Sequence, residues 1–188
     1  PVNVLHLNSS SATYTLVDNL TPGEHTITVR KRNEAASSTI GVKTLDVIGG
    51  QFLAPPAKAS RTIEFVGDSI TCGFGNMIPS AASGPDHFST ETEDGCLTYA
   101  TLVAQALGAE ATIVAQSGIN FVRIKDNNFN PYYEKTAAVI EKTGSADPWD
   151  FASHPQDVVV INLGTNDNGA TKDDEYMTAE AGNFLKLV

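Results

Sequence analysis

The amino-acid sequence predicts an α/β fold in which a parallel β-sheet follows a region of antiparallel strands. Beyond residue 60, short apolar runs alternate with helical patterns, as they do in a parallel sheet covered by helices. Before residue 55, apolar and polar residues alternate along short runs separated by turn residues, which is typical of antiparallel strands. The proline pair that begins at residue 55 separates the two patterns, because proline lacks a backbone N–H and resists helix. We therefore expect two domains, at residues 1–54 and 55–188.

The first domain is expected to be the carboxyl-terminal part of a β-sandwich. Its predicted strands are separated by turn clusters and cover residues 2–6, 12–17, 25–30 and 40–47. A small two-sheet sandwich takes about seven strands, so these runs are too few to cover both of its sheets. The rest of the sandwich is expected upstream of Pro1.

The second domain is expected to contain parallel strands at residues 62–66, 111–115 and 158–163. Each is a short apolar run, rich in β-branched side chains, that leads into a turn containing glycine. Helical spacing of apolar residues predicts helices at residues 97–107 and 132–142, and a further helix that begins at residue 173.

Two of these strands end in turns that carry polar or reactive side chains. The first strand is followed by Gly67, Asp68 and Ser69, and the third is followed by Gly-Thr-Asn-Asp at residues 164–167. The carboxyl ends of parallel strands lie at one edge of an open sheet, and ligands bind in the crevice there. The two turns are therefore expected to border one crevice.

These turns resemble the sequence blocks of the SGNH, or GDSL-type, hydrolases. Gly-Asp-Ser at 67–69 is similar to the first block, Gly-Thr-Asn-Asp at 164–167 is similar to the third, and Gly118 is similar to the glycine that completes the oxyanion site. The longer stretches 63–75 and 158–167 resemble carbohydrate esterase family two, the two-domain acetyl esterases of plant polysaccharides. Members of that family carry a jelly-roll-like β-sandwich before the hydrolase domain.

The resemblance implies an SGNH-type three-layer αβα fold with a five-stranded parallel sheet. The chain has the residues for three of these strands, so the carboxyl-terminal strands are expected to be absent from it. Residues 55–188 would then be the amino-terminal part of the hydrolase domain.

The same resemblance implies that Ser69 is the nucleophile of an ester hydrolase. A serine hydroxyl needs a base to become reactive, and the oxyanion of the tetrahedral intermediate needs preorganised donors. The implied donors are the backbone N–H groups of Ser69 and Gly118 and the side-chain amide of Asn166. Taken singly, Gly118 could be an ordinary turn residue and Asn166 a helix cap. Asp68 and Asp167 are expected to support the site by accepting N–H groups of their turns.

The catalytic base is expected beyond Val188. The family takes its histidine from an Asp-x-x-His block near the carboxyl terminus, and this sequence contains no such block. His154 directly precedes the third strand, and six residues at about 3.3 Å each span about 20 Å, so this histidine should lie at the opposite edge from Ser69. The same geometry gives Trp149 a packing role. His87, in a polar loop, remains a minor candidate for the base.

Composition and charge restrict the partners of the chain. Acidic residues outnumber basic ones by 22 to 12, and the net charge of -10 argues against binding to a nucleic-acid backbone. No run of about eighteen apolar residues predicts a membrane span. Cys72 and Cys96 lack metal-ligand spacing, and a bridge between them is possible but not favoured. Cys72 is expected to be buried below the nucleophile turn, and neither a metal nor an organic cofactor is expected.

The sequence therefore predicts a secreted serine esterase that removes O-acetyl groups from plant cell-wall polysaccharide of the acetyl xylan or mannan type. Without the expected histidine, the chain alone should have an incomplete site, which a carboxyl-terminal segment of the same protein would complete. Two alternatives stay open. One is a carbohydrate-binding module with weak or no turnover, and the other is a general SGNH lipase or esterase.

Overall fold

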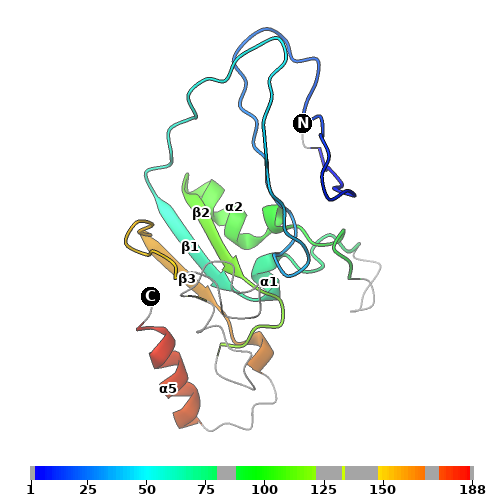
Figure 1. The fold of residues 1–188 in the computed structure, drawn as a ribbon. Coiled ribbons are helices and arrows are strands. Elements are labelled where there is room, and N and C mark those ends of the chain that lie inside the picture. The colour runs from blue at the N-terminus through cyan, green and yellow to red at the C-terminus, as the bar shows by residue number, and fades with distance from the viewer. Residues whose placement is uncertain (1–2, 80–87, 122–132, 134–147, 168–173, 187–188) are drawn as a thin grey trace.

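The centre of the protein is a three-stranded parallel sheet with the strand order β2-β1-β3. The computed structural model describes residues 3–79, 88–121, 133, 148–167 and 174–186. In these residues the strands are β1 (Thr62–Gly67), β2 (Glu110–Ala115) and β3 (Val158–Asn162) (Figure 1). Each strand predicted beyond residue 60 is confirmed to within a residue or two at its ends, and so is the parallel pairing.

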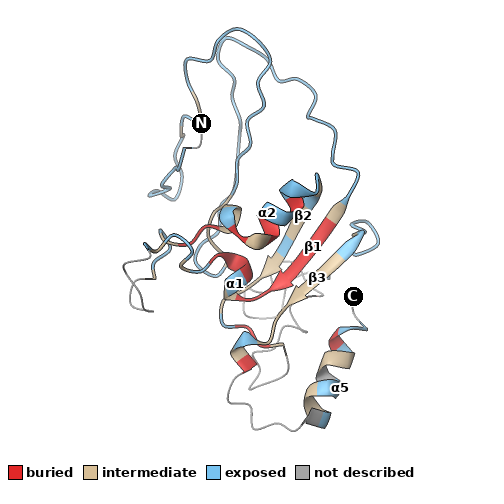
Figure 2. Ribbon diagram, turned by 180° about the vertical axis from the view of Figure 1, so that it is seen from behind, coloured by how far each residue is buried: buried red, intermediate tan, exposed pale blue. Residues whose placement is uncertain are grey.

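The middle strand, β1, forms the core because both of its faces are covered. Ile63 and Phe65 pack against Ala100 and Ala104 of α2 (Tyr99–Ala106). On the other face, Val66 belongs to a cluster with Ile119, Tyr133 and Phe184, the last from α5 (Asp174–Phe184). Figure 2 shows the buried residues gathered along β1 and on the side of α2 that faces it. The layered α/β architecture expected from the sequence is therefore present.

Two of the predicted helices are confirmed. The helix expected at 97–107 is α2, preceded by the short 3-10 helix η2 (Gly95–Leu97), and the helix expected from residue 173 is α5. Gly108, which follows α2, has a φ of 61°, a left-handed conformation that suits glycine at the end of a helix. All but one of the residues of the helix expected at 132–142 lie outside the described residues.

The strands expected before residue 55 are not present in the structure. Within the described residues 3–61 no strand is assigned, and Figure 1 shows this region reaching away from the sheet and returning to it near α1 (Ser69–Cys72). A strand needs a neighbour that accepts its ladder hydrogen bonds and covers its apolar face. Here apolar side chains such as Val42 and Leu45 are exposed, so that cover is missing. The domain boundary near residue 55 stays a prediction.

One turn of this region, residues 31–35, is partly buried and contacts the rest of the molecule. The Gly95 N–H donates to the Arg32 carbonyl at 2.7 Å, and the Arg32 side chain pairs with Asp94 at 3.1 Å. The region is therefore attached beside α1 and η2. None of the helices in the described part of the chain is long and apolar enough to cross a lipid bilayer.

Candidate active site

Ser69 follows the carboxyl end of the central strand as the first residue of α1. Asp68 caps this short helix, because its Oδ1 accepts the Ile70 N–H at 3.0 Å. Gly67 is needed because a Cβ there would lie 1.9 Å from the Thr71 Oγ1. The Gly-Asp-Ser sequence thus allows a close turn in which Asp68 is buried and Ser69 stays partly exposed.

Gly118 lies in the turn that follows β2, beside the turn of Ser69. The Gln116 N–H donates to the Gly67 carbonyl at 3.2 Å, which joins the two turns directly. Gly118 is exposed and has a φ of 77°, a conformation that disfavours any side chain. A Cβ at this position would meet no atom within 4 Å, so there is space beside Gly118 for a ligand.

Asn166 lies in η3 (Thr165–Asp167), just after β3, and is bonded to the same turn. Its Nδ2 donates to the Ile119 carbonyl at 2.9 Å, and its own carbonyl accepts from the Asn120 side chain at 2.7 Å. Asp167 accepts the Phe121 N–H at 2.9 Å. An amide nitrogen carries two hydrogens, so the bond to Ile119 leaves one for another acceptor.

The structure thus brings the turns of Ser69, Gly118 and Asn166 to one edge of the sheet, after three adjacent strands. Asp68 and Asp167 each accept a backbone N–H there. The catalytic and oxyanion roles of these residues stay predictions.

His154 lies at the opposite edge of the sheet, as its position before β3 predicts. The neighbouring Pro155 carbonyl accepts from Thr62, the first residue of β1, at 3.4 Å. The His154 ring is exposed and packs on Trp149, with their ring centroids 4.6 Å apart. The packing role between layers expected for Trp149 stays a prediction. His87 lies outside the described residues, and no hydrogen bond links Ser69 to a histidine within the described part of the chain.

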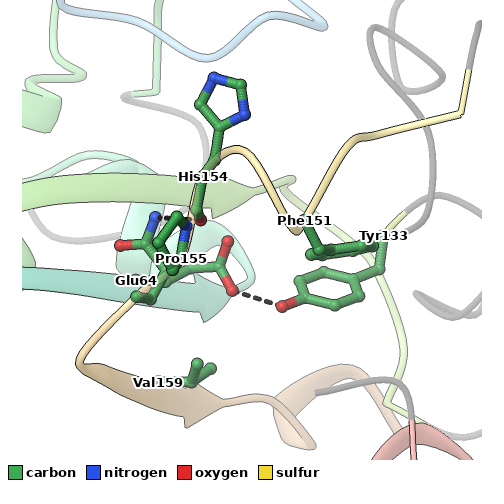
Figure 3. A pocket seen from close by; sticks show the side chains of 7 residues that line it. Glu64, Tyr133, Phe151, His154, Pro155 and Val159 are labelled. Carbon is green, nitrogen blue, oxygen red and sulfur yellow. Dashed lines mark hydrogen bonds between the residues drawn. The ribbon is translucent and has the colours of Figure 1, made fainter.

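A separate pocket lies near the amino end of the sheet, and Figure 3 shows seven residues that line it, among them Glu64, Tyr133 and Phe151. The Tyr133 hydroxyl donates to the Glu64 carboxylate. Burial, and then this hydrogen bond, raises the pKa of Tyr133. The ring of His154 points away from the pocket in this view. Because a buried carboxylate needs a donor, we interpret the Tyr133–Glu64 pair as part of the core.

Sequence reasoning missed a cluster of charged residues behind the Ser69 turn. The Glu34 carboxylate accepts the Ser117 N–H at 2.8 Å and lies 3.8 Å from the Cys72 Sγ. The Glu34 N–H in turn donates to the fully buried Glu93 at 2.8 Å. The signal in the sequence was the charged run at 30–34, which interrupts a stretch of otherwise uncharged residues.

Burial shifts the pKa of two members of this cluster, Cys72 and Glu93. It raises the pKa of the Cys72 thiol, an effect increased by the Glu34 and Glu93 carboxylates, and it also raises the pKa of Glu93. Potential ligand atoms of these three residues lie within 4.8 Å of one another. The Glu34 and Glu93 carboxylates accept the backbone N–H groups of Ser117 and Glu34. We therefore describe the cluster as a hydrogen-bonded support for the turns around it. Cys72 is buried, as expected, and is not bonded to Cys96.

Comparisons with known proteins match both parts of the chain. The family model described as GDSL-like lipase/acylhydrolase matches residues 63–187, and the model described as carbohydrate esterase 2 N-terminal matches residues 1–56. The cellulase/esterase CelE of Acetivibrio thermocellus is 34% identical over 168 residues, which are 89% of this chain and 20% of that protein. An acetylxylan esterase / glucomannan deacetylase of Cellvibrio japonicus is 34% identical over 92% of this chain and 50% of its own length.

A solved structure of a family two carbohydrate esterase from Clostridium thermocellum, in complex with cellohexaose, has the same fold. Its TM-score is 0.62 with 33% identity, over 76% of this chain and 43% of that chain. The chain therefore spans half or less of the length of these relatives.

Proposed function

Because the chain belongs to the GDSL-like lipase/acylhydrolase family, we propose that the protein is a secreted serine esterase that removes O-acetyl groups from plant cell-wall polysaccharide. The observation that carries the proposal is the meeting of three turns at one sheet edge, with Ser69 in the first of them. Similarity to carbohydrate esterases of family two supports the choice of an ester bond and of a sugar-bearing substrate.

In the proposed reaction the Ser69 hydroxyl attacks the acetyl carbonyl while a base takes its proton. The negative charge that develops on the carbonyl oxygen is stabilised by the N–H groups of Ser69 and Gly118 and by the free hydrogen of the Asn166 amide. The C–O bond to the sugar then breaks, and the sugar oxygen takes the proton back from the base. Water cleaves the acetyl-Ser69 ester in a second, equivalent step, which releases acetate.

The base is a histidine outside the described part of the chain. The three described histidines have no hydrogen bond to Ser69, and two of them, His6 and His25, lie in the region before residue 55. The reaction as proposed needs no metal or organic cofactor, since the nucleophile, donors and base are all protein groups.

Acetylated xylan or glucomannan is the proposed substrate. The Cellvibrio japonicus relative is named for both activities, and the net charge of -10 fits a neutral polymer better than a polyanion. Secretion belongs to the same proposal, because a cell-wall polymer must be met outside the cell.

The test is acetate release from acetylated xylan and glucomannan by the intact protein and its Ser69→Ala variant. We expect the rate constant for release to fall by about 1,000-fold or more, because the nucleophile is lost while the oxyanion donors remain. Ser153→Ala is the matched control, since Ser153 is exposed and lies near the other edge of the sheet. Acetate release that survives in Ser69→Ala would overturn the proposal.

A second candidate is a binding function with little turnover, which the cellohexaose complex of the Clostridium thermocellum relative favours. Titration with cellohexaose separates the two. Unchanged affinity in Ser69→Ala, with no acetate release by the parent protein, would support the binder. A preference for long-chain esters over acetyl esters would instead indicate a general SGNH lipase or esterase.

A further inference from the structure

We propose that Glu34, in the region before the sheet, is a positioning residue that holds the Ser117–Gly118 turn in its oxyanion-binding conformation. The inference rests on the proposed esterase function. It adds a residue from outside the SGNH blocks to the set that determines activity.

The turn after β2 is fixed by a bond on nearly every residue. The Gln116 N–H bonds to the Gly67 carbonyl, and the Ile119 carbonyl accepts from Asn166. Between them, the Ser117 N–H donates to the Glu34 Oε2 at 2.8 Å. Two of these three partners belong to the SGNH blocks themselves. Glu34 is the one partner that comes from the region before residue 55.

The bond to Glu34 matters because Gly118 leaves the Ser117–Gly118 peptide unit free to rotate. The Ser117–Gly118 peptide carries the N–H that is proposed to face the oxyanion. With glycine on one side, this peptide can turn over at little steric cost, which would point the N–H away. The Ser117 N–H belongs to the preceding peptide unit, so its bond to Glu34 fixes the plane from which the Ser117–Gly118 peptide continues. A fixed preceding plane limits the orientations that the Gly118 N–H can take, and Glu34 acts in this way from outside the three turns.

Glu34 is itself held in place by its neighbours. Its N–H donates to Glu93, and its carbonyl accepts from the Lys31 Nζ at 2.9 Å. These bonds fix the backbone of Glu34, from which its carboxylate reaches the Ser117 N–H.

The test compares Glu34→Ala, Glu34→Gln and Glu34→Asp in the intact protein, with kcat and KM measured for acetate release. We expect kcat to fall about 10- to 100-fold in Glu34→Ala, since small displacements of catalytic donors cost factors of this size. KM should change by less than about threefold, because the turn acts on the transition state. Gln keeps an oxygen that accepts the Ser117 N–H and should recover most of kcat. Asp keeps the charge but is too short to reach, and should resemble Ala.

Arg32→Ala is the matched control, because it removes the ion pair of the same turn while leaving the Glu34–Ser117 bond. We expect its melting temperature to fall with kcat nearly retained. An equal loss of kcat in Arg32→Ala and Glu34→Ala, or no recovery in Glu34→Gln, would overturn the positioning role.

Hydrogen exchange of the Ser117 amide gives a second readout that does not depend on activity. Exchange should be at least about 10-fold faster in Glu34→Ala than in Glu34→Gln, and equal rates would contradict the inference. Ser69→Ala separates this inference from the esterase proposal. If Ser69→Ala abolishes acetate release while Glu34→Ala keeps full kcat, the positioning role alone fails. If Ser69→Ala stays active, the esterase proposal fails and the exchange rates still decide the role of Glu34.

Discussion

Gly67 and Asp68 show how two residues determine where Ser69 lies. Asp68 is fully buried and turns the chain by capping α1, which it can do only because Gly67 leaves room for Thr71. The requirement at Gly67 is steric, since its backbone is an ordinary strand. At Gly118 the requirement is conformational, because its φ is positive and nothing would touch a Cβ there.

The steric requirement at Gly67 can be tested by comparing it with Gly182, which has no such requirement. Gly67→Ala places a Cβ against the Thr71 side chain, and we expect the free energy of unfolding to fall by about 1–3 kcal/mol. Gly182→Ala, inside α5 with open space around it, should raise that free energy by about 0.5–1 kcal/mol. Urea denaturation measures both. If Gly67→Ala raised the free energy of unfolding as Gly182→Ala does, the Thr71 side chain would be shown to move aside without loss of stability.

The positions of the two turns that carry candidate site residues could be predicted from the sequence. The Gly-Asp-Ser turn and the Gly-Thr-Asn-Asp turn were both expected at the carboxyl ends of strands, and they lie there. The reason is that such turns are encoded locally, by residues within a few positions of one another. Bonds between turns, such as the one from Asn166 to Ile119, have no comparable local signal.

At the scale of elements, α5 joins the sheet mainly through one aromatic residue. Phe184 is fully buried and makes edge contacts with Phe121 and Tyr133, with ring centroids 5.7 and 5.4 Å apart. It belongs to the same cluster as Val66 of β1. The helix that follows the Asn166 turn is therefore anchored at its last residue.

Removal of the Phe184 ring should destabilise the folded protein. We expect Phe184→Ala to lower the free energy of unfolding by about 3–5 kcal/mol, because a large cavity is left in a packed cluster. Phe52→Ala is the control, since Phe52 is exposed in the region before the sheet and its loss should change stability by less than about 0.5 kcal/mol. Similar losses in the two variants, measured in urea, would argue against the assignment of the core.

Elements were predicted well where one strand is buried on both faces and poorly where strands need distant partners. β1 reads as a short apolar run, interrupted by Glu64, because α2 and the Phe184 cluster cover its two faces. The alternating runs before residue 55 carry a similar propensity, yet no strand forms among residues 3–61. Alternation shows that a segment suits a sheet, but the partner strand must come from elsewhere.

At the scale of the whole molecule, the turn at 31–35 connects distant parts of the chain. The bond from Ser117 to Glu34 joins residues 83 positions apart, and the bond from Glu34 to Glu93 joins residues 59 apart. No pattern within a short window of sequence could have indicated either bond. This is why the sequence suggested the five candidate site residues but not the support behind them.

The same connection predicts how stability depends on pH. Burial raises the pKa of Glu93, so the folded protein holds a proton that the unfolded chain releases near the ordinary value of 4.5. Between these two pKa values the native state binds more protons, so stability must fall as the pH rises through that window. Glu93→Gln mimics the protonated form. We expect the variant to lose less stability than the parent when the pH is raised from 4 to 7.

Chemical denaturation of the parent and Glu93→Gln at several pH values measures this dependence. Asp157→Asn is a suitable control, because Asp157 is exposed at the amino edge of the sheet, far from the cluster. Identical pH profiles for the parent and Glu93→Gln would mean that the pKa of Glu93 does not differ between the folded and unfolded states, which would contradict this prediction.

The hydrogen bond from Ser117 to Glu34 also limits how the chain can be recombined. A designer who cut at the proline pair and joined residues 55–188 to a foreign module would remove the acceptor of the Ser117 N–H. Division of the chain at the proline pair is therefore expected to disturb the turn that contains Ser117. A chimaera that retained residues 31–35 in their native arrangement, by contrast, would carry the acceptor with it.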